Sequence, residues 1–279
     1  MSDVVIRRPA RRKGLFLMVG TALLVLFALL AVFGAVIAPA DPNAQDLLAL
    51  LDPPSAAHWL GTDEIGRDIL SRVIVGTRVT LAIAGASTLL AGIAGIALGV
   101  IAGYAGGALD RGIMLLLDLL MTIPSIVLAI AIVAAVGANE IGLITAIIVS
   151  FVPSLARLVR ARVLELRELD YIEAARAIGM HHVRILLRHL LPNAVSVIVI
   201  ELSLMAGQAV LVGSALGFLG LGVQPPAPEW GAMLGASREY LQVAPHVALA
   251  PGLAVTLLVL AFNLFGDGLR DWLDPTATR

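Results

Sequence analysis

Long apolar runs recur along this chain and constrain its fold more than any other feature. They lie at about 15–38, 79–103, 113–136, 141–158, 194–216 and 247–265. A helix needs roughly 20 apolar residues to cross the hydrocarbon core of a bilayer, and the chain is 59% hydrophobic and only 14% charged. A β-barrel would show short alternating segments instead. We therefore expect an all-α polytopic membrane protein with six transmembrane helices.

The distribution of basic residues predicts the orientation. With both termini in the cytoplasm, fifteen of the 19 Lys and Arg are cytoplasmic, among them five from Arg7 to Lys13 and seven from Arg157 to Arg188. The outside keeps Arg67, Arg72, Arg78 and Arg238. This asymmetry agrees with the positive-inside rule. The first apolar run exceeds the roughly 7–15 residues of a signal-peptide core, so we expect it to be retained as the first span.

The sequence also lacks the residues that several kinds of function need. Lys13 is the only lysine, and Gly14 follows it, so the Gly-Lys-Ser/Thr of a phosphate-binding P-loop is missing. If transport is driven by ATP, another subunit must hydrolyse it. There are no cysteines, which excludes disulfides and thiolate metal sites. The net charge of −1 argues against a nucleic-acid partner.

Residues 170–192 form the longest polar interruption between apolar runs in the C-terminal half. Asp170 can cap a helix that begins at Tyr171, and Glu173 stands where its carboxylate can reach back to that cap. Three strong helix formers with almost no side-chain bulk follow, namely Ala174, Ala175 and Ala177. A helix of this kind can lie close to another surface. Gly179 can then turn left-handed and end it.

A second helical run follows at 183–191 and leads to Pro192. Proline fits the first turn of a helix because the N–H that it lacks would have no partner there. We therefore expect Pro192 to lie in the first turn of a new helix, with the fifth span at about 194–216. The third span, at 113–136, contains Pro124 and is expected to kink there.

Polar residues inside the spans are candidates for a functional site, because charges in lipid are costly. Asp118 lies about two turns from the cytoplasmic end of its span, and an ion pair explains it better than a substrate contact. Glu201 and Gln208 could line a polar translocation path, although hydrogen bonds between helices would also explain them. Asn263 has the same ambiguity. His181 and His182 are adjacent and so point to different faces, which favours surface residues over a metal pair.

The segment at 218–230 is too rich in Gly and Pro for a regular span. It is expected to form short re-entrant or surface-lying pieces, because irregular backbone at membrane depth must rest against protein or a watery cavity. A lid over a translocation path and an interfacial anchor around Trp230 are both compatible with it.

Three stretches resemble one protein family. Glu173-Ala174-Ala175, Gly179 and Leu191-Pro192 are similar to the EAA loop of permease subunits in bacterial binding-protein-dependent ABC importers. RHLLPN at 188–193, LGTDEIGRDILSR at 60–72 and FLGLGVQPPAPEWG at 218–231 resemble the branch that imports dipeptides, oligopeptides or nickel. The long polar loop after the first span resembles the C-type permease of these heterodimers.

The chain departs from the family pattern at three positions. His189 stands where the general pattern has an aliphatic residue, and Gly213 and Gly217 stand where the family often has an acidic residue and a serine. These departures leave the roles of Gly213 and Gly217 open.

The resemblance implies a division of the chain and a set of coupling residues. Residues 1–78 would hold the N-terminal segment, the first span and an external loop. Residues 79–279 would form the permease core, with a coupling segment at 161–192 between spans four and five. This segment would dock in a cleft of an ATP-binding subunit. The residues implied in that coupling are Glu173, Ala174, Ala175, Gly179, Leu191 and Pro192.

The resemblance also implies the partners and the activity. The chain would be a permease subunit in a bacterial inner membrane, binding no cofactor and catalysing no reaction itself. It would pair with a homologous permease, two ATP-binding subunits that hold ATP and Mg²⁺, and an extracytoplasmic solute-binding protein. Di- or oligopeptides are the expected substrates, with nickel or another small solute as the alternative.

Two other functional classes remain as alternatives. An intramembrane hydrolase would need a Ser nucleophile beside a His base, and Ser214 with His246 is the only such pair near the outer face. Ser214 does not stand in a Gly-x-Ser-x-Gly elbow. An ion-coupled carrier working alone is disfavoured by the scarcity of intramembrane charge and the lack of a visible internal repeat.

Overall fold

The computed structural model describes residues 14–273, and within that range the chain is helical and has no strand. The basic residues from Arg7 to Lys13, on which the orientation was partly predicted, lie outside the described residues, as does the tail from Asp274. The helices are α1 (Leu15–Ile37), α2 (Ile69–Ala105), α3 (Gly107–Met121), α4 (Ser125–Val136), α5 (Glu140–Arg167), α6 (Asp170–Ala177), α7 (His182–Ile185), the π turn η1 (Leu186–Leu190), α8 (Leu191–Phe218), α9 (Trp230–Ser237), the 3₁₀ turn η2 (Arg238–Tyr240) and α10 (His246–Leu273).

Five helical stretches are long and apolar enough to cross a membrane. They are α1, α2, α5, the rod from His182 to Phe218, and α10. Each coincides with a predicted span, although α2 and α5 continue well beyond the apolar runs, and α2 alone has 37 residues. At about 1.5 Å per residue, such a helix measures roughly 55 Å, so one or both of its ends extend beyond the hydrocarbon core.

The remaining predicted span, at 113–136, is not one kinked helix. It consists of α3 and α4, which meet at 91° across a break at residues 122–124. Pro124 stands immediately before α4. Its missing N–H and its ring prevent the preceding helix from continuing through it, and the residue before it is pushed towards an extended conformation. The kink expected at Pro124 is therefore a complete break.

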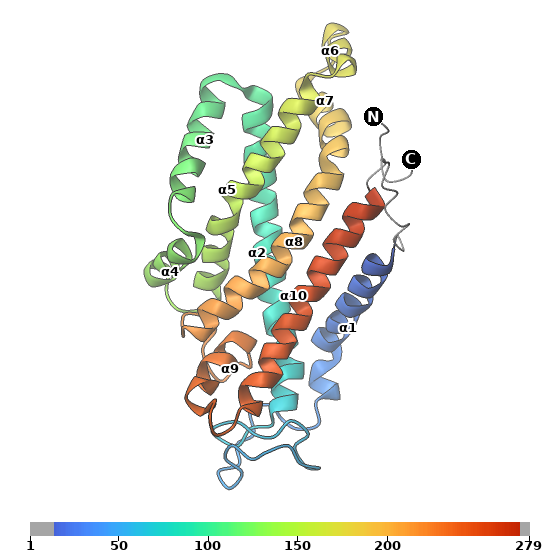
Figure 1. Cartoon of the computed structure of the whole chain (residues 1–279). Coiled ribbons are helices and arrows are strands. Elements are labelled where there is room, and N and C mark those ends of the chain that lie inside the picture. The colour runs from blue at the N-terminus through green and yellow to red at the C-terminus, as the bar shows by residue number, and fades with distance from the viewer. Residues whose placement is uncertain (1–13, 274–279) are drawn as a thin grey trace, which may run out of the picture.

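The long helices lie side by side, with α2 in the middle of the bundle and in contact with α1, α5 and α8 (Figure 1). α1 and α10 pack against each other on one flank, and α3 and α4 lie on the other (Figure 1). α6 projects from one end of the bundle, which we call the α6 end, and α9 lies at the opposite end (Figure 1). α1 runs away from the α6 end and α10 runs towards it, and the start of α1 and the end of α10 both stop short of α6 (Figure 1).

A row of glycines brings α2 against α5. Gly95, Gly99 and Gly103 follow at intervals of four residues and are all buried on the face that meets α5. A Cβ atom at Gly99 would stand 2.5 Å from the carbonyl oxygen of Ala156 and 2.7 Å from Cβ of Val159. At each of the other two glycines, the nearest α5 side-chain atom would be 2.9 Å away. Small residues spaced in this way let transmembrane helices approach closely.

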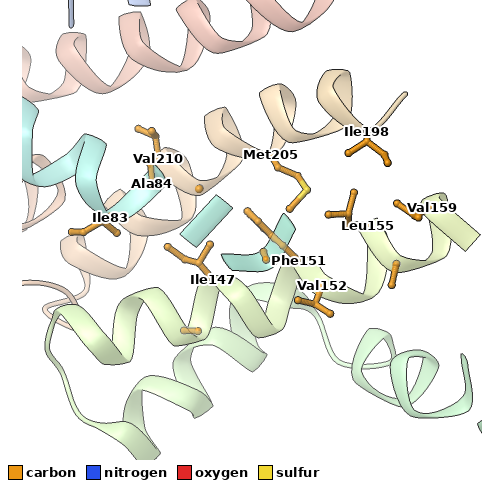
Figure 2. Packing of buried hydrophobic residues seen from close by; sticks show 14 of the residues in the cluster. Ile83, Ala84, Ile147, Phe151, Val152, Leu155, Val159, Ile198, Met205 and Val210 are labelled. Carbon is orange, nitrogen blue, oxygen red and sulfur yellow. The ribbon is translucent and has the colours of Figure 1, made fainter. Parts of the chain in front are cut away.

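The apolar core lies where α2, α5 and α8 converge, and Figure 2 shows side chains from all three helices pointing towards one another. The labelled core residues are Ile83 and Ala84 of α2, Ile147, Phe151, Val152, Leu155 and Val159 of α5, and Ile198, Met205 and Val210 of α8. Many leucines on the outer faces of α1, α3 and α10 are exposed. Such a distribution suits helices whose outer faces meet lipid.

At the end opposite α6, the segment at 218–231 is fixed to the start of α2. Trp230 is fully buried, and its Nε1 donates a hydrogen bond to the Val73 carbonyl at 3.0 Å. The Phe27 ring meets the indole edge-on, with centroids 6.0 Å apart. Gly76 leaves no room for a Cβ, because the Pro228 carbonyl oxygen occupies that space. The interpretation of Trp230 as an interfacial anchor is wrong, since protein covers the indole.

Glu229 begins α9 and is itself buried. Its carboxylate accepts hydrogen bonds from the N–H groups of Gly231 at 2.8 Å and Ala232 at 2.7 Å, which makes it the cap of the helix. Burial raises the pKa of the Glu229 carboxyl, and the two backbone N–H donors oppose that rise. A Cβ at Gly217 would collide with the Glu229 carboxylate. Gly217, where the related pattern often has serine, therefore makes room for the cap.

Two of the four arginines assigned to the outside are neutralised by ion pairs. Arg67 Nε lies 2.6 Å from Asp63 Oδ2, and Arg67 also pairs with Glu64 at 3.0 Å. Arg72 Nε lies 3.4 Å from the same Asp63 oxygen. Asp63, Arg67 and Arg72 are all buried. Paired charges of this kind behave as a neutral group. A simple count of basic residues on each side therefore overstates the evidence of Arg67 and Arg72 against the predicted orientation.

Candidate coupling segment and polar face of α8

The first turn of α6 differs from the predicted one. The helix begins at Asp170, Leu169 occupies the cap position, and no side chain caps it. The Leu169 carbonyl accepts from the N–H groups of Ile172 at 2.9 Å and Glu173 at 3.3 Å, which starts the helix one residue early. The predicted cap by Asp170 and the return contact by Glu173 are therefore wrong. Both carboxylates still lie in the first turn, where the helix dipole favours negative charge.

The end of α6 is the predicted one. Gly179 has a φ of +77°, in the left-handed region. Its N–H donates to the Arg176 carbonyl at 2.9 Å, and the Met180 N–H donates to the Ala175 carbonyl at 3.0 Å. These two bonds form a Schellman motif, which satisfies carbonyls that the helix end would otherwise leave unpaired. A Cβ at Gly179 would meet nothing within 4 Å, so the backbone conformation alone requires glycine here.

The two faces of α6 are distinct. Ile172 and Ala175 are buried against the rest of the chain, whereas Glu173, Ala174 and Ala177 are exposed. Ala175, one of the alanines predicted to lie close to another surface, is thus buried against its own chain. The free face combines a carboxylate with small side chains and continues into Ile178, whose side chain is 78% exposed.

Pro192 does not open a separate helix. The rod from His182 to Phe218 is continuous and passes through the π turn η1, in which the Leu191 N–H donates to the Leu186 carbonyl five residues earlier. Proline has no N–H to offer the carbonyl of Arg188, and its ring crowds that carbonyl. The wider π turn accommodates the proline without breaking the helix, which the sequence pattern did not predict. Pro192 still lies in the first turn of the regular helix α8.

A polar cluster joins α6 to this π turn. The Asn193 Nδ2 donates to the His189 carbonyl at 2.6 Å and lies 3.4 Å from the Tyr171 hydroxyl. The rings of Tyr171 and His189 have centroids 6.1 Å apart. Arg162 of α5 contacts the Asn193 carbonyl at 3.5 Å. Motif reasoning missed Tyr171 and Asn193, because their roles depend on residues that only the fold brings together.

A second cluster joins the start of α7 to the last turn of α2. The Tyr104 hydroxyl lies 2.6 Å from Nδ1 of His182, and the two rings meet edge-on. The Arg176 guanidinium lies over the Tyr104 ring, 5.7 Å from its centroid, at cation–π distance. His181 instead accepts from the Val183 N–H at the start of α7. The two adjacent histidines thus have separate structural contacts, as expected for surface residues.

Glu201 and Gln208 lie on one face of α8. Seven residues separate them, so their side chains project within about 20° of each other. Gln208 is exposed and Glu201 is half-buried. Neither side chain makes a hydrogen bond or ion pair with any residue in the described range 14–273. A polar face without partners in its own chain must meet either water or another protein, because lipid cannot satisfy it.

The acidic residues of α3 pair with α5. Asp118 forms an ion pair with Arg157, and both side chains are about half exposed. The structural ion pair favoured for Asp118 is thus present, with an arginine of the next long helix as its partner. Asp110 makes a two-pronged contact with Arg160, which the sequence did not suggest. These pairs hold α3 against α5.

The hydrolase alternative finds no support in the geometry. Ser214 Oγ and His246 Nε2 are both buried, and neither has a hydrogen-bond partner among the described residues, so they do not contact each other. A nucleophile and its base must be within hydrogen-bonding reach. Within residues 14–273, no group of three or more His, Asp or Glu side chains could hold a metal ion.

Comparison with known proteins gives two matches to family models. Residues 95–279 match the family model described as "Binding-protein-dependent transport system inner membrane component". Residues 12–54 match the family model described as "N-terminal TM domain of oligopeptide transport permease C". Together they cover the candidate coupling segment, the polar face of α8 and the first span.

Several curated proteins are similar over most of their length. The glutathione transport system permease protein GsiD of Pectobacterium atrosepticum is 49% identical over 233 residues, covering 84% of this chain and 77% of that protein. The dipeptide transport system permease protein DppC of Alkalihalophilus pseudofirmus is 44% identical over 264 residues, covering 95% and 87%. GsiD of Escherichia coli O157:H7 is 45% identical over 259 residues, covering 92% and 86%.

A solved structure has a similar fold. A chain of the MetNI methionine ABC transporter, in an inward-facing conformation, superimposes with a TM-score of 0.57 at 22% identity, covering 72% of this chain and 93% of that chain. Members of the matched family work with ATP-binding and substrate-binding partners and are not themselves enzymes. From its sequence and fold together, the chain belongs to the inner-membrane components of binding-protein-dependent transport systems, as a multi-pass permease subunit of an ABC importer.

Proposed function

We propose that the α6 end faces the cytoplasm and that α6 is the coupling helix of an ATP-driven peptide importer. The observation that carries this proposal is the position of α6, which projects beyond the bundle with Glu173, Ala174 and Ala177 exposed (Figure 1). An exposed face of small side chains has no role in the packing of its own chain. It suits close contact with a cleft on a partner.

The direction of the helices supports six spans with both ends in the cytoplasm. α1 runs away from the α6 end and α10 runs towards it (Figure 1), so the chain from the start of α1 to the end of α10 crosses the membrane an even number of times. α2 ends at the α6 end and α5 begins at the opposite end (Figure 1). The bent pair α3–α4 therefore carries the chain across between them, and it supplies the sixth crossing alongside the five long spans.

Charge supports the same orientation. Seven arginines lie between Arg157 and Arg188, in the last turns of α5 and in the segment that follows it towards the α6 end. The positive-inside rule places such a cluster in the cytoplasm. On the opposite side, Arg67 and Arg72 are paired with carboxylates.

The proposed substrates are dipeptides and other short peptides. Two of the relatives named above are described as glutathione and dipeptide permeases. A homologous permease would form the other half of the path, two ATP-binding subunits would hold ATP and Mg²⁺, and a solute-binding protein would deliver the peptide. ATP binding would favour one state of the permease pair only through its differential affinity for the two states.

This assignment is tested with the whole transporter. An affinity-tagged chain, expressed in its native host, is expected to co-purify ATP-binding subunits from detergent extracts. A deletion strain is expected to lose uptake of a labelled dipeptide and to regain it with the plasmid-borne chain. Labelled glutathione and ⁶³Ni²⁺ are tested in parallel. Uptake of nickel alone would contradict the peptide assignment, and a chain that purifies without ATP-binding subunits would contradict coupling through α6.

The polar face of α8 is proposed to line the translocation path. The chain has no cysteines, so Gln208→Cys gives a single reactive thiol. We expect a membrane-impermeant maleimide to label it in the assembled transporter, with labelling that changes by about tenfold or more between the nucleotide-free and ATP-trapped states. The matched control is Val25→Cys, in the middle of α1, whose native side chain is 51% exposed. Equal labelling at the two positions in both states would exclude Gln208 from the path.

A further inference from the structure

The movement of a coupling helix must reach the helix that lines the path, and the structure contains one short connection between them. α6 and α8 are joined along the chain by α7 and the π turn η1. In space they are joined by the cluster of Tyr171, His189 and Asn193. The cluster lies where regular helix gives way to the π turn.

The π turn is the weak point of the rod from His182 to Phe218. Pro192 cannot donate to the carbonyl of Arg188, so one bond of the regular ladder is missing there. The Asn193 side chain bridges the interrupted turn instead, because its Nδ2 donates a hydrogen bond to the His189 carbonyl at 2.6 Å. Helices bend most readily where a proline and a π turn interrupt the ladder. The π turn is therefore a bending point of the rod, close to its α6 end.

Tyr171 brings α6 to this bending point. It is the second residue of α6, and its hydroxyl lies 3.4 Å from the Asn193 Nδ2 that bridges the turn. Two buried nitrogen atoms beside the cluster, Nε of Arg162 and Nε2 of His189, have no hydrogen-bond partner among the described residues. The contact between Tyr171 and Asn193 therefore connects α6 directly to the bridged turn.

The opposite side of the coupling segment is tied to α2. The contact of Tyr104 with His182 and Arg176 fixes the start of α7 to the last turn of that helix. α7 itself is only four residues long, and the π turn follows directly. Because Arg176 belongs to α6 and His182 to α7, this contact also joins α6 to α7. A displacement of α6 and α7 relative to α8 is therefore concentrated in the π turn.

We propose that Tyr171 and Asn193 are positioning residues that transmit the displacement of α6 to α8, with the π turn at 186–190 and Pro192 as the hinge. The inference rests on the proposed coupling role of α6. The part of α8 beyond the hinge carries Glu201 and Gln208, so bending at the hinge would reorient the polar face. Neither Tyr171 nor Asn193 needs to contact ATP, the ATP-binding subunit or the transported solute.

The test measures transport against ATP hydrolysis in the purified, reconstituted transporter. Asn193→Ala and Tyr171→Phe remove the polar groups of the cluster. Both native side chains are exposed, so we expect the variants to fold. We expect each variant to co-purify ATP-binding subunits in the wild-type ratio and to lose about tenfold or more in peptide transported per ATP hydrolysed. The matched controls are Ser196→Ala, one turn further along α8, and Tyr240→Phe at the opposite end. Both are expected to behave as wild type.

The outcomes separate the two proposals. If the wild-type chain does not co-purify ATP-binding subunits, the coupling role of α6 fails. If it does, and the two variants transport as much peptide per ATP as the controls, the transmission role is overturned. Loss of subunit binding in the variants would also overturn it, because these residues would then serve docking or folding.

A distance measurement tests the hinge directly. Pairs of spin labels are attached to cysteines introduced into the otherwise cysteine-free chain, with partner subunits that also lack cysteine. One pair, Ile178→Cys with Val195→Cys, spans the hinge, and the other, Val195→Cys with Leu211→Cys, lies within α8. All three native side chains are at least 49% exposed. ATP trapping is expected to change only the first distance, and Asn193→Ala is expected to reduce that change. Unchanged distances, or equal changes in both, would overturn the hinge.

Discussion

Gly179→Asp is expected to reduce peptide uptake to below about a tenth of wild type while leaving the amount of permease in the membrane unchanged. The substitution keeps the Schellman turn, because Asp is among the few residues that visit the left-handed region, at a cost of roughly 1–2 kcal/mol. A side chain there meets nothing in its own chain. It does place bulk and negative charge at the end of the exposed face of α6, where the ATP-binding subunit is proposed to dock.

The measurements are uptake of a labelled dipeptide and the membrane level of the chain by immunoblot. Gly107→Asp is the matched control, because Gly107 also has a positive φ and open space at its Cβ position but lies at the start of α3. It pays the same backbone cost and should transport at least half as well as wild type. Normal uptake in Gly179→Asp would remove α6 from the coupling contact. Equal losses in both variants would point to backbone strain as the cause.

Gly99→Ile is expected to remove most of the chain from the membrane. The first atom of any side chain at Gly99 would stand 2.5 Å from the Ala156 carbonyl oxygen, which belongs to the backbone of α5 and cannot rotate away. The helices would have to separate along the whole contact between α2 and α5. We expect a loss of stability at or above the roughly 1–3 kcal/mol typical of overpacked cores.

The experiment compares membrane levels and thermal unfolding in detergent. Gly85→Ile is the control, because Gly85 lies on the same helix and a Cβ there meets nothing within 4 Å. Both variants change helix propensity alike, so a difference between them reports packing against α5. A stable, abundant Gly99→Ile variant would show that the two helices do not pack as closely as described.

The sequence predicts the parts of this fold that depend on local chemistry. Five spans follow from apolar length alone, and the left-handed turn at Gly179 follows from residue type. The break at Pro124 was predicted in position and underestimated in size. The start of α6 was missed by one residue because the choice between Leu169 and Asp170 depends on which backbone carbonyl accepts the first bond.

The features that could not be predicted all depend on contacts between distant segments. The indole of Trp230 donates a hydrogen bond to the Val73 carbonyl, 157 positions away in the chain. Tyr171 contacts Asn193 across the coupling segment. The π turn allows the helix to continue through Pro192 without a break. No pattern in the sequence distinguishes such a turn from a helix end. The apolar composition identifies which residues are buried only after the neighbouring helices are known.

The fit between Gly217 and Glu229 has a consequence for how this chain can change. The cap needs both an acceptor at 229 and an empty space at 217, so a side chain can be added at 217 only if the acceptor at 229 changes or moves. A related chain that carries serine at the equivalent of 217 must accommodate its cap differently. We therefore expect positions 217 and 229 to vary together across homologues. A side chain introduced at 217 alone should require a compensating substitution at 229.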